Sequence, residues 1–143
     1  MYCLAERHLS SIQKAIQSAH AVVEYSLKYG DTFDYKKWAE VDKTLIVLDG
    51  GCVPDLSEHV EILTQFNYPF AVFNEPDLGD ILTCVCFIAD DRIYDYKNWG
   101  VSYNDYLEKV YPGMAHYDTW LNDIGGPKAE AVKQMISSLK LSL

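Results

Sequence analysis

Acidic residues and a threonine lie together in the segment EPDLGDILT, between the apolar runs FAVF and CVCFIA. Glu75 and Asp77 can accept a proton, and the hydroxyl of Thr83 can hold a water molecule or a substrate oxygen. These residues also suit a plain turn, because Pro76 biases the residue before it toward extended geometry. The residue types alone leave both interpretations open, a reactive site and a plain turn.

The first long helix is predicted over residues 10–29. Ser10 and Gln13 have the spacing of a capping box, and Gly30 follows the last turn as a stop signal. Apolar residues recur at spacings of three and four, which predicts a single buried face. The residues of this face are Ile12, Ile16, Ala19, Val23 and Leu27.

The remaining pattern predicts a small α/β protein with the order β-α-β-α-β-β. Strands are expected at 2–6, 43–49, 70–73 and 82–89, and one or two helical turns at 34–41. A second helix is expected at 55–66, with Asp55 and Glu58 as a capping pair and Leu56, Val60 and Leu63 along its buried face. A docked C-terminal helix should begin at Pro127 and bury Val132, Met135, Ile136 and Leu139.

Composition favours one compact, soluble, acidic domain. The chain has 143 residues, 49% hydrophobic and 23% charged, with a net charge of −9. An acidic chain is a poor generic binder of nucleic acid, because such binding depends on Lys and Arg at the phosphates. We find no membrane-spanning stretch and no secretory signal, so we expect no membrane partner and a cytoplasmic location, or the host cytoplasm if a phage encodes the chain.

Several kinds of site are disfavoured by the motifs. No glycine-rich phosphate loop is present, and the pair Gly50 and Gly51 lacks the rest of a dinucleotide fingerprint. The four histidines are scattered and the four cysteines have the character of buried, reduced thiols, so no metal site is expected. We therefore expect no cofactor.

The residues after 90 differ in texture from those before, with many tyrosines and tryptophans separated by turn residues. We expect a core at 1–90 and an extension at 91–143 that packs on it. Aromatic faces can stack on a base without a basic surface, which makes Tyr94 and Trp99 candidates for ligand binding. The simpler interpretation is that these rings pack the extension onto the core or form a homodimer contact.

The helix segment AIQSAHAVVEY and the later FNEPDLGDILTCVCFIA together resemble the second family of peptidyl-tRNA hydrolases, the archaeal and eukaryotic type, and more closely its bacterial and phage relatives. Ala15, Gln17, His20 and Ala21 match a helix motif of that family, A-x-Q-x-x-H-A. The resemblance covers residues 2–89. It implies a four-stranded mixed sheet between helices.

The resemblance also implies a site. Glu75, or Asp77 in a different loop register, falls at the family's acidic position and Thr83 at its threonine. Ser11, Gln13, Gln17 and His20 would face this loop across a cleft. There the acid would act as base for water attacking the ester of peptidyl-tRNA, and Thr83 would orient the water.

One departure weakens the implied chemistry. Ser11 and Gln13 stand where the family has basic residues, so the expected lysine is missing. Lys14 is rotated by about 100° from Gln13 on a helix, which predicts that it lies off the cleft face. Loss of a charged donor to the oxyanion would cost about 3 kcal/mol in the transition state, roughly a hundredfold in rate.

Three functions follow as hypotheses. The first is a hydrolase of peptidyl-tRNA or a related acylated nucleotide, weakened or intact. The second is a binding protein without catalysis, which sequesters a small nucleotide or other metabolite in the cleft. The third is an acidic interaction or inhibitor module that mimics nucleic acid.

Overall fold

The computed structural model describes residues 1–94 and 121–142. Its elements follow the predicted order and end with a C-terminal helix. The strands are β1 (Tyr2–Ala5), β2 (Ile46–Asp49), β3 (Phe70–Glu75) and β4 (Ile81–Phe87). The α-helices are α1 (Ser11–Tyr29), α2 (Phe33–Lys37), α3 (Val53–Gln65) and α6 (Pro127–Ser137). Short π- and 3-10 turns are η1 (Trp38–Asp42), η2 (Pro76–Leu78) and η3 (Asp91–Tyr94).

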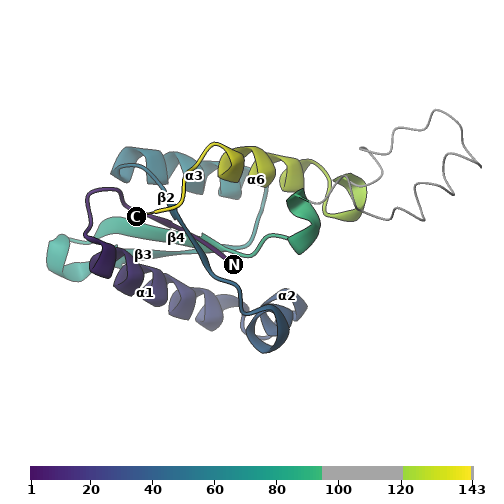
Figure 1. The fold of residues 1–143 in the computed structure, drawn as a ribbon, viewed down its shortest axis with the longest axis horizontal. Helices are drawn as coiled ribbons and strands as arrows, with labels where there is room; N and C mark the ends of the chain where they lie inside the picture. The colour runs from purple at the N-terminus through teal and green to yellow at the C-terminus, as the bar shows by residue number, and fades with distance from the viewer. Residues whose placement is uncertain (95–120, 143) are drawn as a thin grey trace, which may run out of the picture.

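The four strands form one mixed sheet in the order β2-β1-β4-β3. β1 pairs in parallel with β2 and antiparallel with β4, and β3 pairs antiparallel with β4. Figure 1 shows the sheet between two helical layers, with α1 on one side and α3 and α6 on the other. The predicted α/β architecture with a four-stranded mixed sheet is confirmed.

The two faces of the sheet carry side chains of different size. The face toward α3 and α6 bears Leu4, Leu48, Val85 and Phe87. The fully buried strand residues on the face toward α1 are small instead: Cys3, Ala71, Cys84 and Cys86, with Val47 and Phe73 partly buried beside them. Small side chains let α1 approach closely, and the thiol Sγ of Cys86 lies 3.0 Å from the carbonyl oxygen of Ala21.

The predicted buried face of α1 is wrong. The residues of this helix that are buried against the sheet are Lys14, Gln17, Ser18, Ala21 and Tyr25. The stripe of Ile12, Ile16, Ala19, Val23 and Leu27 points outward and is exposed. The reason is the small-residue face of the sheet, which accepts a close helix with a small and polar inner side.

The ends of α1 agree with the sequence, whereas the start of α3 differs. Ser10 and Gln13 form the predicted capping box, and Gly30 is the C-cap. α3 begins at Val53, two residues before the expected start, and its N-cap is Cys52. Asp55 is the third helical residue and its carboxylate accepts the Cys52 backbone N–H at 2.8 Å. Asp55 and Glu58 therefore do not form the predicted capping pair.

The C-terminal helix docks as predicted, except that Leu139 lies beyond its end and is only partly buried. α6 begins at Pro127 and buries Val132, Met135 and Ile136 in the cluster that holds Leu56 and Leu63 of α3. Beyond α6, Leu141 makes an antiparallel bridge to Leu48 of β2. In the described ranges 1–94 and 121–142, no helix has the length and apolarity needed to cross a bilayer.

Candidate functional site

The polar residues singled out in the sequence meet at one end of the sheet. β1 and β2 are parallel neighbours, and α1 and α3, which follow them, cover opposite faces (Figure 1). In open α/β sheets the carboxyl ends of strands at such a switch in direction form the usual ligand crevice. β3 ends and β4 begins at this same end of the sheet. Ala5 at the end of β1 pairs with Cys84 near the start of β4, and Glu75 at the end of β3 pairs with Ile81.

Gln17 connects a hydroxyl and a carboxylate at this edge. The Thr83 hydroxyl donates to Gln17 Oε1 at 2.8 Å, and Gln17 Nε2 donates to Glu75 Oε2 at 2.5 Å. Thr83 is 1% exposed and Gln17 5% exposed, so the hydrogen bond between these two side chains is shielded from water. Glu75 is partly buried at the end of β3. The three groups form one hydrogen-bonded chain that runs from the sheet core to the surface.

A β-bulge turns Thr83 toward α1. Phe73 pairs with Cys84 and Asn74 with Leu82, so Thr83 is the extra residue on β4. Without the bulge, Thr83 would alternate with Cys84 and point to the α3 face. The hydroxyl instead reaches Gln17 and lies 3.1 Å from the Phe73 carbonyl oxygen. Bulges that redirect a side chain in this way are common beside functional sites.

Glu75 is held as a carboxylate. The hydrogen bond from Gln17 and the backbone N–H of Asp77, at 3.3 Å from Glu75 Oε1, lower the pKa of Glu75 below its ordinary value, with a further contribution from His20. Asp77 follows in η2 with an exposed side chain. Of the two acids considered for this position, Glu75 is the one that contacts Gln17.

The helix residues proposed for the site divide into two groups. The His20 ring is exposed and stacks on Phe73, with ring centroids 4.5 Å apart, so it lies beside the cluster. Ser11 is exposed, and the Gln13 side chain accepts the Ser10 backbone N–H at 2.9 Å as part of the helix cap. Gln17 and His20 thus approach the 75–83 segment, and Gln13 serves the start of the helix.

Two charged residues at the same end of the sheet are buried, which the sequence did not predict. Lys14 is buried on the side of α1 that also holds Gln17. Burial raises the pKa of Asp49 at the end of β2, but hydrogen bonds from the Gly51 N–H and from Arg7 outweigh it and lower this pKa, and the charge of Lys14 adds a smaller lowering. The expectation that Lys14 lies off this face is wrong, because the helix is rotated relative to its apolar pattern. Glu6, directly after β1, is also buried; its carboxylate accepts the His8 backbone N–H at 2.7 Å, and its own N–H donates to the Thr83 carbonyl.

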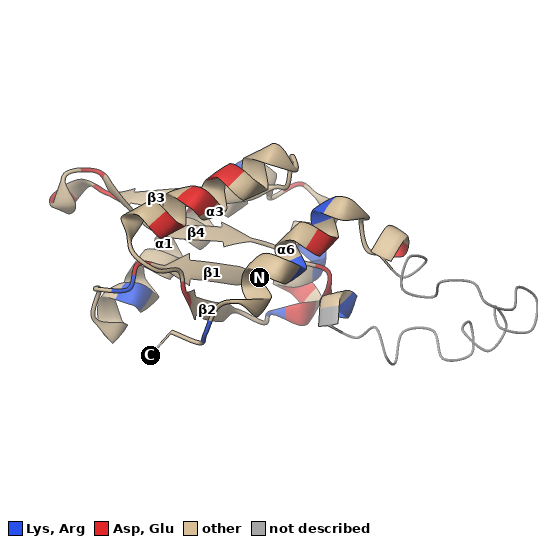
Figure 2. Cartoon of the chain, turned by 90° about the horizontal axis from the view of Figure 1, so that it is seen from above, with Lys and Arg blue, Asp and Glu red and all other residues tan. Residues whose placement is uncertain are grey.

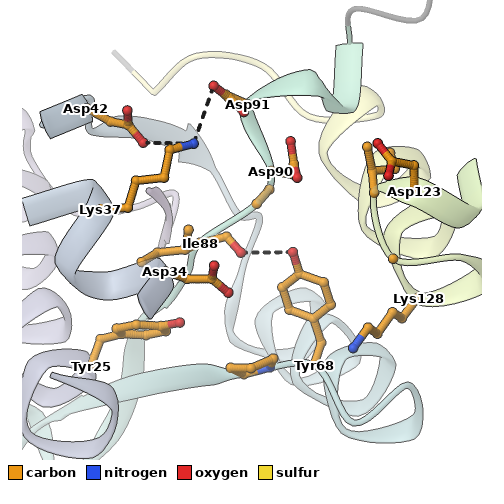
Figure 3. A pocket seen from close by; sticks show the side chains of 14 residues that line it. Tyr25, Asp34, Lys37, Asp42, Tyr68, Ile88, Asp90, Asp91, Asp123 and Lys128 are labelled. Carbon is orange, nitrogen blue, oxygen red and sulfur yellow. Dashed lines mark hydrogen bonds and ion pairs between the residues drawn. The ribbon is translucent and has the colours of Figure 1, made fainter. Parts of the chain in front are cut away.

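A cavity of about 300 Å³ lies at the opposite end of the sheet (Figure 3). It is bordered by Ile88 and Ala89, which follow β4, and Thr83 is separated from Ile88 by about 17 Å of strand. Neither candidate aromatic can be placed in it: Trp99 lies outside the described residues, as does the side chain of Tyr94. The cavity was not anticipated from the sequence, since its lining comes from five separate segments.

Most charges of the cavity are paired. Lys37 lies 3.8 Å from Asp42 and 3.6 Å from Asp91, and Arg92 bridges Asp90 and Asp123. Asp34 and Lys128 also line the cavity, and neither has an ion pair with another described residue. Figure 3 shows them on different walls, with Tyr68 between them.

The Tyr25 hydroxyl opens into the same cavity. Tyr25 is 2% exposed, and burial raises the pKa of its hydroxyl, which stays protonated. Tyr68 donates its hydroxyl to the Ile88 carbonyl at 2.8 Å, whereas the Tyr25 hydroxyl has no hydrogen bond within the described part of the chain. In Figure 3 this hydroxyl points into the hollow.

Within residues 1–94 and 121–142, no group of three His, Cys, Asp or Glu is arranged to hold a metal ion. No model of a known protein family matches the chain, and no curated protein matches it significantly. Function must therefore be argued from the two sites themselves.

Proposed function

We propose that the protein hydrolyses the ester of a peptidyl-tRNA or a related acylated nucleotide at the edge formed by Gln17, Glu75 and Thr83. The hydrogen-bonded chain through Gln17 carries this proposal. The buried amide of Gln17 hydrogen-bonds both to Thr83 and to the partly exposed carboxylate of Glu75. These bonds fix the orientation of the carboxylate, which can then act on a substrate at the surface.

In this mechanism Glu75 is the general base. It accepts a proton from water as the water attacks the ester carbonyl, and its low pKa keeps it ionised at neutral pH. His20, exposed beside it, donates to the developing oxyanion. Thr83 is too deeply enclosed to reach a substrate, so it acts as a positioning residue that orients the Gln17 amide. Lys14 supplies a positive charge on the same side of the helix.

The proposal is tested by the release of an N-acylated amino acid from tRNA. Glu75→Gln should lower kcat/KM by about a hundredfold or more, the usual contribution of a general base. Asp77→Asn is the matched control, because the Asp77 carboxylate is exposed and has no bond to Gln17, and it should keep the full rate. Absence of turnover above a protein-free control, or full turnover by Glu75→Gln, would reject the proposal.

A pH profile separates positioning from simple folding effects. Because hydrogen bonding lowers the pKa of Glu75, the rate should stay flat as the pH falls and decline only below the ordinary glutamate value of 4.5. Gln17→Met removes the main cause of this shift, so the midpoint of its acid limb should move upward. A midpoint that is unchanged in Gln17→Met would show that Gln17 does not tune Glu75.

A second candidate function is the sequestration of a small metabolite, and the cavity of Figure 3 favours it. Acidic groups predominate in its lining, so a phosphorylated ligand such as a nucleotide would be repelled. Among the described residues, the cavity groups without an ion pair are one acid, Asp34, and one base, Lys128, and the Tyr25 hydroxyl has no hydrogen bond to them. This set fits a small zwitterion such as an amino acid, with its ammonium at Asp34 and Tyr25 and its carboxylate at Lys128.

Calorimetry with a panel of free amino acids and a panel of nucleotides tests this candidate. Binding of an amino acid should weaken in Tyr25→Phe, Asp34→Asn and Lys128→Gln. Asp31→Asn, which changes an exposed acid paired with Lys36 outside the cavity, is the control and should bind normally. Binding of nucleotides in preference to amino acids would contradict the assignment.

A further inference from the structure

The outer side of α1 is an apolar surface that faces away from the sheet. Ile12 is 74% exposed, Ile16 48%, Val23 56% and Leu27 77%. With 3.6 residues per turn, this stripe is centred about 180° from the buried side chains of the same helix. Figure 1 shows α1 as the outer layer on its side of the sheet. We call the stripe of Ile12, Ile16, Ala19, Val23 and Leu27 the outer α1 face.

The outer α1 face is also uncharged over most of its length. Between Ser11 and Val23 the one charged residue is Lys14, which is buried on the opposite side. The chain as a whole has a net charge of −9, and Figure 2 shows acidic residues along α3 on the other layer. A partner that binds mainly through charged residues is therefore not expected on this face. A second copy of the chain can meet this face with no like charges opposed along the stripe.

The spacing of the face suits two-fold symmetry. Ile12 and Leu27, and likewise Ile16 and Val23, lie at equal distances from a point between Ala19 and His20. In an interface between identical surfaces each residue meets its counterpart, so a pattern that reads alike in both directions pairs with itself in antiparallel orientation. Ala19, near the centre, permits close approach of the two helices.

We propose that two copies of the chain associate through the outer α1 face, with the helices antiparallel about a two-fold axis near Ala19. One helix pair is small against the roughly 800 Å² per partner of a stable interface, so the dimer is weak and forms at micromolar or higher concentration. Because each copy carries −9, added salt strengthens the association by screening the repulsion.

Sedimentation equilibrium over a concentration series tests the association. The wild type should shift from monomer to dimer, and more readily at high salt. Ile16→Lys places a charge near the centre of the face and should leave a monomer with an unchanged circular dichroism spectrum. Val41→Lys makes the same kind of change at a residue 72% exposed outside α1 and should dimerise like the wild type. A wild type that stays monomeric up to about 0.2 mM, or an Ile16→Lys variant that dimerises normally, overturns the proposal.

Oxidative cross-linking tests the orientation. Ala19→Cys places thiols next to the axis and should give a covalent dimer under mild oxidation. Leu27→Cys should not, because antiparallel pairing separates the two copies of residue 27 by about 22 Å along the helix, whereas a disulfide needs Cα atoms about 5.5–6 Å apart. The wild type is run beside both, since Cys52 is partly accessible. Equal cross-linking through residue 27 would contradict the antiparallel arrangement.

Discussion

The two helices that flank the sheet, α1 and α3, bury opposite kinds of side chain against it. α3 places Leu56 and Leu63 on the large-residue face of the sheet and leaves its acids outside. α1 buries Lys14, Gln17 and Ser18 and leaves its isoleucines outside. Both helices are amphipathic, but only α3 is oriented by its apolar stripe.

The difference lies in the sheet. Leu4, Val85 and Phe87 give α3 and α6 a thick apolar layer in which to bury more apolar area. The cysteines and Ala71 on the other face offer little volume, so α1 is held closely by small contacts and by hydrogen bonds to Thr83 and Glu75. One layer therefore supplies stability, and the other carries the polar site and the outer α1 face.

The largest expected contrast is between apolar truncations on the two helices. Leu63→Ala removes a fully buried side chain of α3 and should lower the free energy of unfolding by about 2–5 kcal/mol. Ile12→Ala removes an exposed side chain of α1 and should change it by less than about 0.5 kcal/mol in dilute protein. Chemical denaturation at low micromolar concentration measures both, and equal losses would refute the comparison.

The polar side of α1 should give an intermediate effect. Gln17→Met leaves the buried Thr83 hydroxyl with the Phe73 carbonyl alone and should cost about 1–3 kcal/mol of unfolding free energy. A double-mutant cycle with Thr83→Val should show a coupling of at least about 0.5 kcal/mol, because the two side chains share a bond. Strictly additive losses would mean that the hydrogen bond contributes nothing to stability.

The cap of α1 should matter less. Ser10→Ala removes the side chain that accepts the Gln13 backbone N–H at 3.3 Å and should lower the unfolding free energy by about 1 kcal/mol. Ser11→Ala, one residue along, alters an exposed side chain and serves as the matched control with almost no loss. Thermal unfolding of both variants measures the two losses. A larger loss for Ser11→Ala would show that Ser10 is not the N-cap of α1.

The smallest effect is expected from His59 on α3. Burial lowers the pKa of His59 from 6.5, so the unfolded chain binds its proton more readily than the folded one. The folded state is therefore not penalised by the burial of neutral His59 above pH 6.5. As the pH falls below 6.5, toward and past the lowered pKa of the folded state, protonation of His59 in the unfolded chain reduces the free energy of unfolding. Melting temperatures at pH 7.5 and 5.5 should show a smaller decline for His59→Asn than for the wild type, and an equal decline would remove His59 as a cause.

Much of the fold follows from local pattern, but the site follows only in part. The order of strands and helices, the Ser10 cap and the docked α6 can all be predicted from neighbouring residues. The meeting of Gln17 with Glu75 and Thr83 was suggested by a family resemblance, and the bulge that completes it has no local signal. Burial of Lys14 and Glu6 and the cavity beside Tyr25 depend on residues far apart in the chain, so the sequence contained no sign of them.

The sequence by itself determined where α1 begins, where it ends and that it is amphipathic, because those properties depend on contacts within a few residues. Only the tertiary structure decided which side of the helix faces the sheet. The orientation depends on the space that the small residues of β1, β3 and β4 leave beside the helix. It also depends on the buried Gln17 amide, which hydrogen-bonds to both Thr83 and Glu75. The orientation of one helix thereby places a polar chain inside the protein and an apolar stripe on its surface.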